Sequence, residues 1–376
     1  MDTVLLLSNF SCTSKKSWKA AWVDGIVRGI FLIFLPLQAL AQPYAVKVPL
    51  GLDDYDYQEK LPKDNPMSAE KVALGRLLFF DRRLSADGTV ACATCHDPAF
   101  GFTDGQPVPT GVKGRKGRRS APTILNRAFG LTQFWDGRAA SLEEQSRAPL
   151  TNPAEMDATP EGVVETLFQI RGYREPFRAA FGTEEVTLDR ISKAIAAFER
   201  TALSGDSAYD RFEYGGLRDA MPEPAQRGLK LFKEKARCNL CHSGTNYSGE
   251  DFHNVGIGWA GIDTTAYGRT KDVKDIHGID PGRYGQTKDV KDFGAFKAPT
   301  LRDVARTAPY AHDGSLKTLE EVIDHYDRGG VPNPFLDPKI QPLHLTAQEK
   351  QDLVAFLKAL DGQGWQRIRA PEKLPE

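Results

Sequence analysis

Two short segments hold the residues with the clearest chemistry, CATCH at 92–96 and CNLCH at 238–242. The spacing Cys-x-x-Cys-His is the attachment motif of c-type haem. Each thiol adds across one vinyl group of the haem, and the adjacent histidine reaches the iron from the proximal side. The sequence therefore predicts two covalently bound c-type haems. Their attachment residues are Cys92, Cys95, His96, Cys238, Cys241 and His242.

Three other interpretations of these cysteines fit the sequence less well. A thioredoxin-like redox pair has no βαβ context here and does not explain a histidine after both pairs. A zinc ribbon needs its two cysteine pairs roughly 15–20 residues apart, whereas Cys92 and Cys238 are 146 positions apart. Structural disulfides are compatible with an exported protein, but cysteines this close rarely pair for stability.

The chain repeats itself around the two motifs. Residues 121–144 align without a gap on residues 298–321, at a constant offset of 177, with nine identities in 24 positions. A Gly-x-x-Leu-Phe segment also precedes each motif, at Gly75 and at Gly228. We therefore expect a mainly α fold of two cytochrome c-like domains, each around one haem, over residues 42–213 and 214–376. A linker is expected at Gly205–Gly216, which is rich in glycine and charge.

Apolar residues at helical spacing predict the helices that must position these motifs. The expected helices are Ala69–Leu78, Val163–Ile170, Leu188–Phe198, Pro224–Glu234 and Gln348–Leu360. A smaller repeat, YGRTKDVKD at 267–275 and YGQTKDVKD at 284–292, indicates a local insertion in a surface loop.

Residues 1–41 are predicted to be a signal peptide, which places the mature protein in the periplasm. Basic residues up to Arg28 precede the short apolar run Gly29–Leu37, and small residues at Ala39 and Ala41 suit cleavage before Gln42. The run is too short to span a bilayer, although an uncleaved anchor is the alternative. The 49 basic and 50 acidic residues of the chain nearly balance, so composition gives no indication of nucleic-acid binding and we expect no stable membrane insertion.

Several longer stretches resemble one family, the bacterial di-haem cytochrome c peroxidases, and within it the MauG-type proteins. They are FFDRRLSADGTVACATCH, SAPTILNRAF, QFWDGRAASLEEQ, NPAEM, GAFKAPTLRDVARTAPYAHDGSLKTLEE and HYDRGG. Together they cover most of residues 70–330. The resemblance implies that hydrogen peroxide is reduced at the N-terminal haem. Oxidising equivalents then pass to or from the C-terminal haem, with a small redox protein as electron donor.

The resemblance also implies roles for four residues outside the attachment motifs. Trp135 matches a tryptophan between the haems that relays electrons, Glu155 matches a distal glutamate that moves protons, and Gln145 matches its neighbour in the peroxide pocket. The distal ligand of the second iron lies fourteen residues after the histidine of the APYxHDG motif, here His312, and this count predicts Tyr326. The adjacent His325 is the rival ligand, and Tyr326 could also be a buried aromatic with no ligand role.

The chain departs from the family pattern at three places. Residues 97–120 contain no histidine or methionine, and Pro149 stands where the offset of 177 places Tyr326, so we expect a five-coordinate first haem that needs no reductive activation. The expected calcium site has Ser120 in place of asparagine, while its carbonyl positions match Thr307 and Pro309. Ala236 replaces a tryptophan that the MauG branch uses for electron transfer to its protein substrate.

Three functions remain open from the sequence. The first is a peroxidase, the second a MauG-like oxidase that modifies a partner protein, and the third a non-enzymatic electron carrier. A basic loop near the first haem is either a solvated face or a site for haem propionates or an acidic donor. It contains Lys113, Arg115, Lys116, Arg118 and Arg119.

Overall fold

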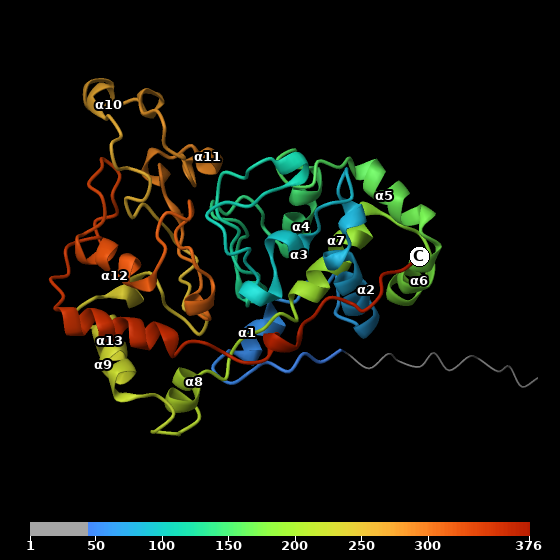
Figure 1. Ribbon diagram of the computed structural model, residues 1–376, viewed down its shortest axis with the longest axis horizontal. Helices are drawn as coiled ribbons and strands as arrows, with labels where there is room; N and C mark the ends of the chain where they lie inside the picture. The colour runs from blue at the N-terminus through green and yellow to red at the C-terminus, as the bar shows by residue number, and fades with distance from the viewer. Residues whose placement is uncertain (1–43) are drawn as a thin grey trace, which may run out of the picture. The chain divides into compact units, whose positions relative to one another are not determined.

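A computed structural model describes residues 44–376, and the predicted signal peptide lies outside this range. The described part is mainly helical (Figure 1). Its only named strands are β1 (Phe252–His253) and β2 (Phe296–Lys297), which pair antiparallel with Phe252 opposite Lys297. Among the described residues, no helix combines the length and apolarity needed to cross a bilayer. The expectation of a mainly α protein is confirmed.

Two helix pairs organise the chain in the same way. In the N-terminal half, α2 (Ala69–Phe80) packs on α7 (Leu188–Glu199), and in the C-terminal half α9 (Glu223–Lys233) packs on α13 (Ala347–Lys358) (Figure 1). A glycine lies at each crossing. A Cβ atom on Gly75 would lie 1.9 Å from the carbonyl oxygen of Ala194, and one on Gly228 would lie 1.9 Å from that of Asp352. Identical close approaches show that the sequence repeat is a repeat of structure.

The predicted helices are present, with ends that differ by up to three residues. The helix predicted at Val163–Ile170 is α5 (Pro160–Gln169), which begins three residues earlier and ends one residue earlier, and α7 extends one residue further than predicted. Ser68, Thr187 and Thr346 cap α2, α7 and α13 by accepting a backbone N–H in the first turn. The remaining α-helices are α1 (Asp54–Glu59), α3 (Cys92–Cys95), α4 (Leu142–Thr151), α6 (Arg174–Phe181), α8 (Ala208–Glu213), α10 (Thr265–Thr270), α11 (Tyr284–Thr287) and α12 (Leu319–Asp327).

The segment expected to be a linker is packed into the fold. It contains α8, and Asp210 in this helix forms an ion pair with Arg302 in which both side chains are fully buried. Two hydrogen bonds of 2.7 and 2.9 Å join the guanidinium to the carboxylate. A glycine-rich, charged sequence usually indicates an exposed loop, but here the charge is neutralised by a distant residue that sequence spacing could not identify.

Residues after α13 return to the N-terminal half (Figure 1). Trp365 belongs to the same apolar core as α2 and α7, with its ring 6.1 Å from that of Phe102. Further along, Arg76 donates to the carbonyl of Arg369, and the N–H of Gly172 donates to the carbonyl of Glu376 at 2.7 Å. Residues 365–376 therefore pack with the first haem motif's half of the molecule rather than with the second.

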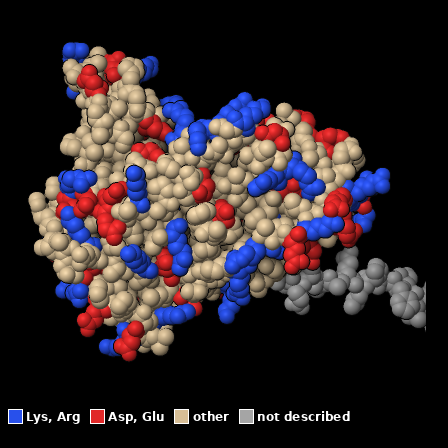
Figure 2. All heavy atoms as spheres, viewed as in Figure 1, with Lys and Arg blue, Asp and Glu red and all other residues tan. Residues whose placement is uncertain are grey.

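The two copies of the small repeat adopt the same conformation. Each forms one helical turn, α10 or α11, which ends at a lysine with positive φ, Lys271 or Lys288. Their environments differ, because Val273 of the first copy is buried while Val290 of the second is 42% exposed. Basic and acidic side chains are interspersed over the face of the molecule seen in Figure 2, which agrees with the nearly balanced charge.

Candidate active site

Each haem motif lies on a single helical turn followed by its histidine. Cys92–Cys95 form α3, and residues 238–240 form a 3₁₀ turn. The Nδ1 of His96 donates to the carbonyl of Phe102 at 3.2 Å, and the Nδ1 of His242 lies 3.1 Å from the carbonyls of Tyr247 and Pro299. Burial lowers the pKa of both imidazoles, that of His242 to about 4. A neutral ring whose Nδ1 is a donor leaves the Nε2 lone pair free for a metal.

Both motifs open into one cavity of about 680 Å³. Cys95, His96, Cys238, Cys241 and His242 all line it. The four thiols of the described residues form no disulfide, and burial raises the pKa of each. Paired thiols, an oriented imidazole and a shared hollow fit the requirements of two covalently attached haems, which would supply the redox chemistry when bound.

Glu155 lies on the cavity wall in the N-terminal half, together with Gln145 of α4. The Nδ2 of Asn152 donates to Oε1 of Glu155 at 2.6 Å. Burial raises the pKa of Glu155, and this outweighs the opposing effects of Asn152 and Arg138. The structure thus brings the two predicted pocket residues to the same cavity as His96 and gives the glutamate a raised proton affinity, as general acid–base work requires.

The basic loop holds the segment that bears Glu155. The N–H of Val112 donates to the Glu155 carbonyl at 2.8 Å. The carboxylate of Asp157 pairs with Lys113 at 3.0 Å and with Arg115 at 2.9 Å. Gly111 permits this contact, because a Cβ there would lie 2.2 Å from the carbonyl oxygen of Ala154. This part of the loop is therefore a support for the pocket, although its exposed ion pairs contribute little energy.

Trp135 lies where the two halves meet and also lines the cavity. Its Nε1 donates to the carbonyl of Ser120 at 2.9 Å, and its carbonyl accepts from the N–H of Lys297 on β2 at 2.8 Å. The N–H of Ser120 in turn donates to the carbonyl of His312 at 2.7 Å. The indole is therefore held within the N-terminal half and the Trp135 backbone is bonded to the C-terminal half, which places the residue at the junction where an electron relay is predicted.

Tyr326 and its rival His325 have different surroundings on α12. Tyr326 lines the cavity, and burial raises the pKa of its phenol, with smaller contributions from Cys241 and Cys238. The Nε2 of His325 is occupied by the carbonyl of Val255 at 2.8 Å. Pro149 of α4 lines the cavity at the corresponding place in the first half. Both residues line the cavity, but Tyr326 interacts electrostatically with the cysteines of the second motif, whereas the Nε2 of His325 is hydrogen-bonded to Val255, so these contacts favour Tyr326 as the residue that faces the second motif.

The residues expected to bind calcium all line the cavity, but their oxygens are neutral. They are Ser120, Thr307 and Pro309. Two carboxylates that line the same cavity, Asp136 and Asp280, both form ion pairs with Arg119 at 2.7 Å. No cluster of three His, Cys, Asp or Glu suited to a metal occurs within residues 44–376. Calcium usually takes carboxylates among its six to eight oxygens, so this donor set fits it poorly.

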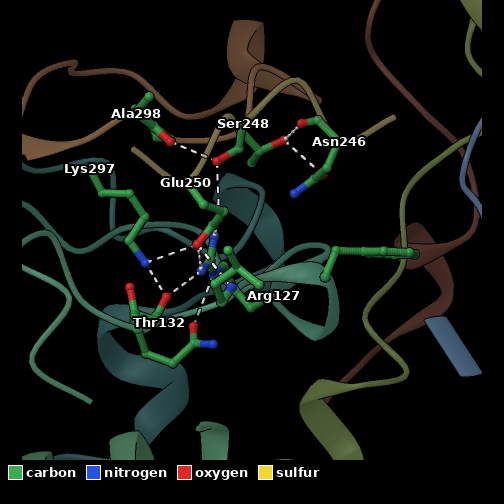
Figure 3. Close-up of polar contacts among 12 residues, drawn as sticks. Arg127, Thr132, Asn246, Ser248, Glu250, Lys297 and Ala298 are labelled. Atoms are coloured by element: carbon green, nitrogen blue, oxygen red, sulfur yellow. Dashed lines mark hydrogen bonds and ion pairs between the residues drawn. The ribbon is translucent and has the colours of Figure 1, made fainter. Parts of the chain in front are cut away.

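A buried polar cluster joins the halves beside the cavity (Figure 3). Arg127 and Lys297 both donate to Glu250, at 2.9 and 3.3 Å, and both also donate to the carbonyl of Thr132. Burial raises the pKa of Glu250, but the two cations outweigh it and hold the pKa at about 2. Burial, reinforced by Arg127, lowers the pKa of Lys297 to about 7. Lys297 lies in the GAFKAPTL segment, but the sequence gave no indication that it would pair with Glu250.

Comparisons with known proteins agree with this arrangement. A family model described as di-haem cytochrome c peroxidase matches residues 69–218. The methylamine utilization protein MauG of Methylorubrum extorquens is 42% identical over 300 residues, 80% of each chain. The cytochrome c551 peroxidase of Nitrosomonas europaea is 36% identical over 299 residues, 79% of this chain and 81% of its own.

A solved structure shows the same fold. It is that of a MauG-like protein associated with microbial copper homeostasis, with a TM-score of 0.74 and 35% identity, and the match covers 87% of this chain and 96% of the other. Together with the curated relatives, it shows that the chain belongs to the di-haem cytochrome c peroxidase family, whose members are oxidoreductases that use hydrogen peroxide.

Proposed function

We propose that this protein reduces hydrogen peroxide in the N-terminal part of the cavity, with electrons that a small redox protein delivers through the C-terminal haem. The observation that carries the proposal is the asymmetry between equivalent positions. The first half presents Pro149 with Gln145 and Glu155 nearby, and the second half presents Tyr326. Proline cannot ligate iron, so the first half leaves room for peroxide.

Glu155 has the properties that the proposed reaction needs. Hydrogen peroxide bound at a metal must lose a proton from one oxygen and gain one on the other, and a single carboxylate within reach of both can transfer it. Burial keeps the proton affinity of Glu155 high, and Asn152 fixes one of its oxygens. Gln145 supplies an amide that can orient peroxide by hydrogen bonding.

A second candidate is a MauG-like oxidase that modifies a residue on a partner protein. Tyr326 favours it, because an anionic oxygen ligand stabilises high oxidation states and makes the second haem a poor acceptor from ordinary cytochromes. Ala236 disfavours it, because this buried position lacks the tryptophan of the MauG branch. Export to the periplasm belongs to the proposal as well, and it rests on the sequence of residues 1–41 alone.

Steady-state turnover distinguishes the two candidates. Purified di-haem protein should consume hydrogen peroxide with a reduced small cytochrome c as donor, in a ratio of two electrons per peroxide. Oxidation of a protein substrate without cytochrome turnover would favour the oxidase. Failure of both reactions in protein that carries two haems would refute the proposed function.

A further inference from the structure

Glu199 is a buried acid that has no part in the proton transfer proposed for Glu155. It is the last residue of α7, it is 4% exposed, and it lines the cavity. Its Oε2 is buried without a hydrogen-bond partner among the described residues. Buried polar atoms are nearly always paired, and an exception asks for an explanation.

The second half has a leucine at the position equivalent to Glu199. A Cβ on Gly75 would lie 2.8 Å from the Cβ of Phe198, and a Cβ on Gly228 would lie 2.8 Å from that of Phe356. The two phenylalanines are therefore equivalent, and so are the residues that follow them, Glu199 and Leu357. Both line the cavity. A carboxyl group thus replaces leucine at one haem site only, the one with the pocket for peroxide.

The charged groups around Glu199 do not neutralise it. Its neighbour Arg200 is already paired with Glu143 by two hydrogen bonds of 2.7 and 2.9 Å. Burial raises the pKa of Glu199 to about 8, which outweighs the opposing effect of Arg200, and Glu143 adds to the increase. Burial raises the pKa of the Cys92 thiol, and Glu199 adds to this increase. A thioether bond to haem would remove the thiol from titration. An unpaired acid in such a place stays protonated rather than bury a charge.

We propose that Glu199 is a proton donor of the N-terminal cavity, which gives its proton to the reduction of hydrogen peroxide and regains it from solvent. The inference rests on the proposed function. Reduction consumes two electrons and two protons per peroxide, breaks the O–O bond and yields two waters. The electrons come from the redox partner. Glu155 moves a proton between the two peroxide oxygens, while Glu199 supplies one of the two protons that must enter, and becomes a carboxylate until it is reprotonated.

The protonation state can be tested without turnover. Infrared difference spectra of the resting di-haem protein between pH 6 and pH 9 should show a carboxylic-acid C=O band that is lost as the pH rises through about 8. The band should be absent in Glu199→Gln and present in Glu175→Gln, a control that removes an exposed acid. A band that still titrates near pH 8 in Glu199→Gln, or no such band in the wild type, would overturn the proposal.

Turnover then tests delivery. Glu199→Gln keeps the shape without the acid, and Glu199→Leu copies the second half, so both should retain haem spectra and helix content. Each variant should slow peroxide reduction about 10²-fold, at the lower end of the range for a positioned acid. The wild-type rate should fall above pH 8, where Glu199 loses its proton, and this fall should be absent in both variants. Wild-type rates and pH profile in both variants would disprove delivery. A wild-type protein that does not reduce peroxide would instead refute the proposed function, and this role with it.

Discussion

Pro149 and Tyr326 occupy equivalent places on α4 and α12, and both line the cavity that the two haem motifs share. The sequence offset of 177 pairs them, and their helices begin alike, with Ser141 and Thr318 as N-caps. One half therefore has a side chain able to bind iron, and the other half has a side chain that cannot.

The first prediction concerns the spin state of the N-terminal haem. Because residues 97–120 contain no histidine or methionine and Pro149 has no donor atom, the ferric protein as isolated should show one high-spin haem in low-temperature electron paramagnetic resonance. It should bind peroxide without prior reduction. Two low-spin signals with no high-spin component would contradict this.

Tyr326 is predicted to be the distal ligand of the second iron, opposite His242. Tyr326→Phe should change the optical and paramagnetic resonance spectra of that haem, while His325→Ala should leave them unchanged. The structure supplies the reason, since the Nε2 of His325 is occupied by the carbonyl of Val255. A low-spin signal lost in the histidine variant and kept in the tyrosine variant would reverse the assignment.

Glu155→Gln should slow peroxide cleavage by about 10²–10⁴-fold, the usual range for loss of a general acid–base. Haem content and folding should change little, because glutamine can still accept the hydrogen bond from Asn152. Stopped-flow mixing with peroxide measures the step directly. Wild-type rates would make Glu155 an ordinary buried acid.

Trp135→Phe should uncouple the two haems. Phenylalanine keeps an aromatic ring but loses the hydrogen bond to the Ser120 carbonyl and the electron relay. The second haem should therefore respond to peroxide more slowly than in the wild type, while peroxide binding at the first is kept. An unchanged response of the second haem would restrict Trp135 to a packing role.

The buried cluster predicts a pH dependence of stability. The pKa of Glu250 is lowered to about 2 from 4.5, so its stabilising contribution is present above about pH 4.5 and is lost as the pH falls towards 2. By linkage the shift corresponds to about 3 kcal/mol for Glu250 alone, and the lowered pKa of Lys297 offsets part of this. Glu250→Gln should therefore lower the free energy of unfolding at pH 7, and by less at pH 3, in denaturant titrations. A difference independent of pH, or one as small as that of the exposed control Glu175→Gln, would contradict this.

The parts that the sequence revealed are those set by local pattern. Apolar spacing with Ser68 and Thr187 as caps specified α2 and α7, and the repeated motifs indicated two similar halves. Contacts between residues far apart in the sequence could not be predicted. Nothing near Asp210 in the sequence pointed to Arg302, 92 residues away. Glu199 lies one residue beyond the helix predicted from the sequence, and its significance appears only when the packing of the two halves makes it equivalent to Leu357.

The return of residues 365–376 to the first half has a consequence for biosynthesis. Arg83, which follows α2, donates to the carbonyl of Pro375 at 2.9 Å, and a groove between this tail and the first motif is lined by Ala93, Thr94 and Arg369. These tail residues leave the ribosome after the whole second half. The N-terminal half, although it is synthesised first, therefore cannot complete its packing until the last residues of the second half have been made.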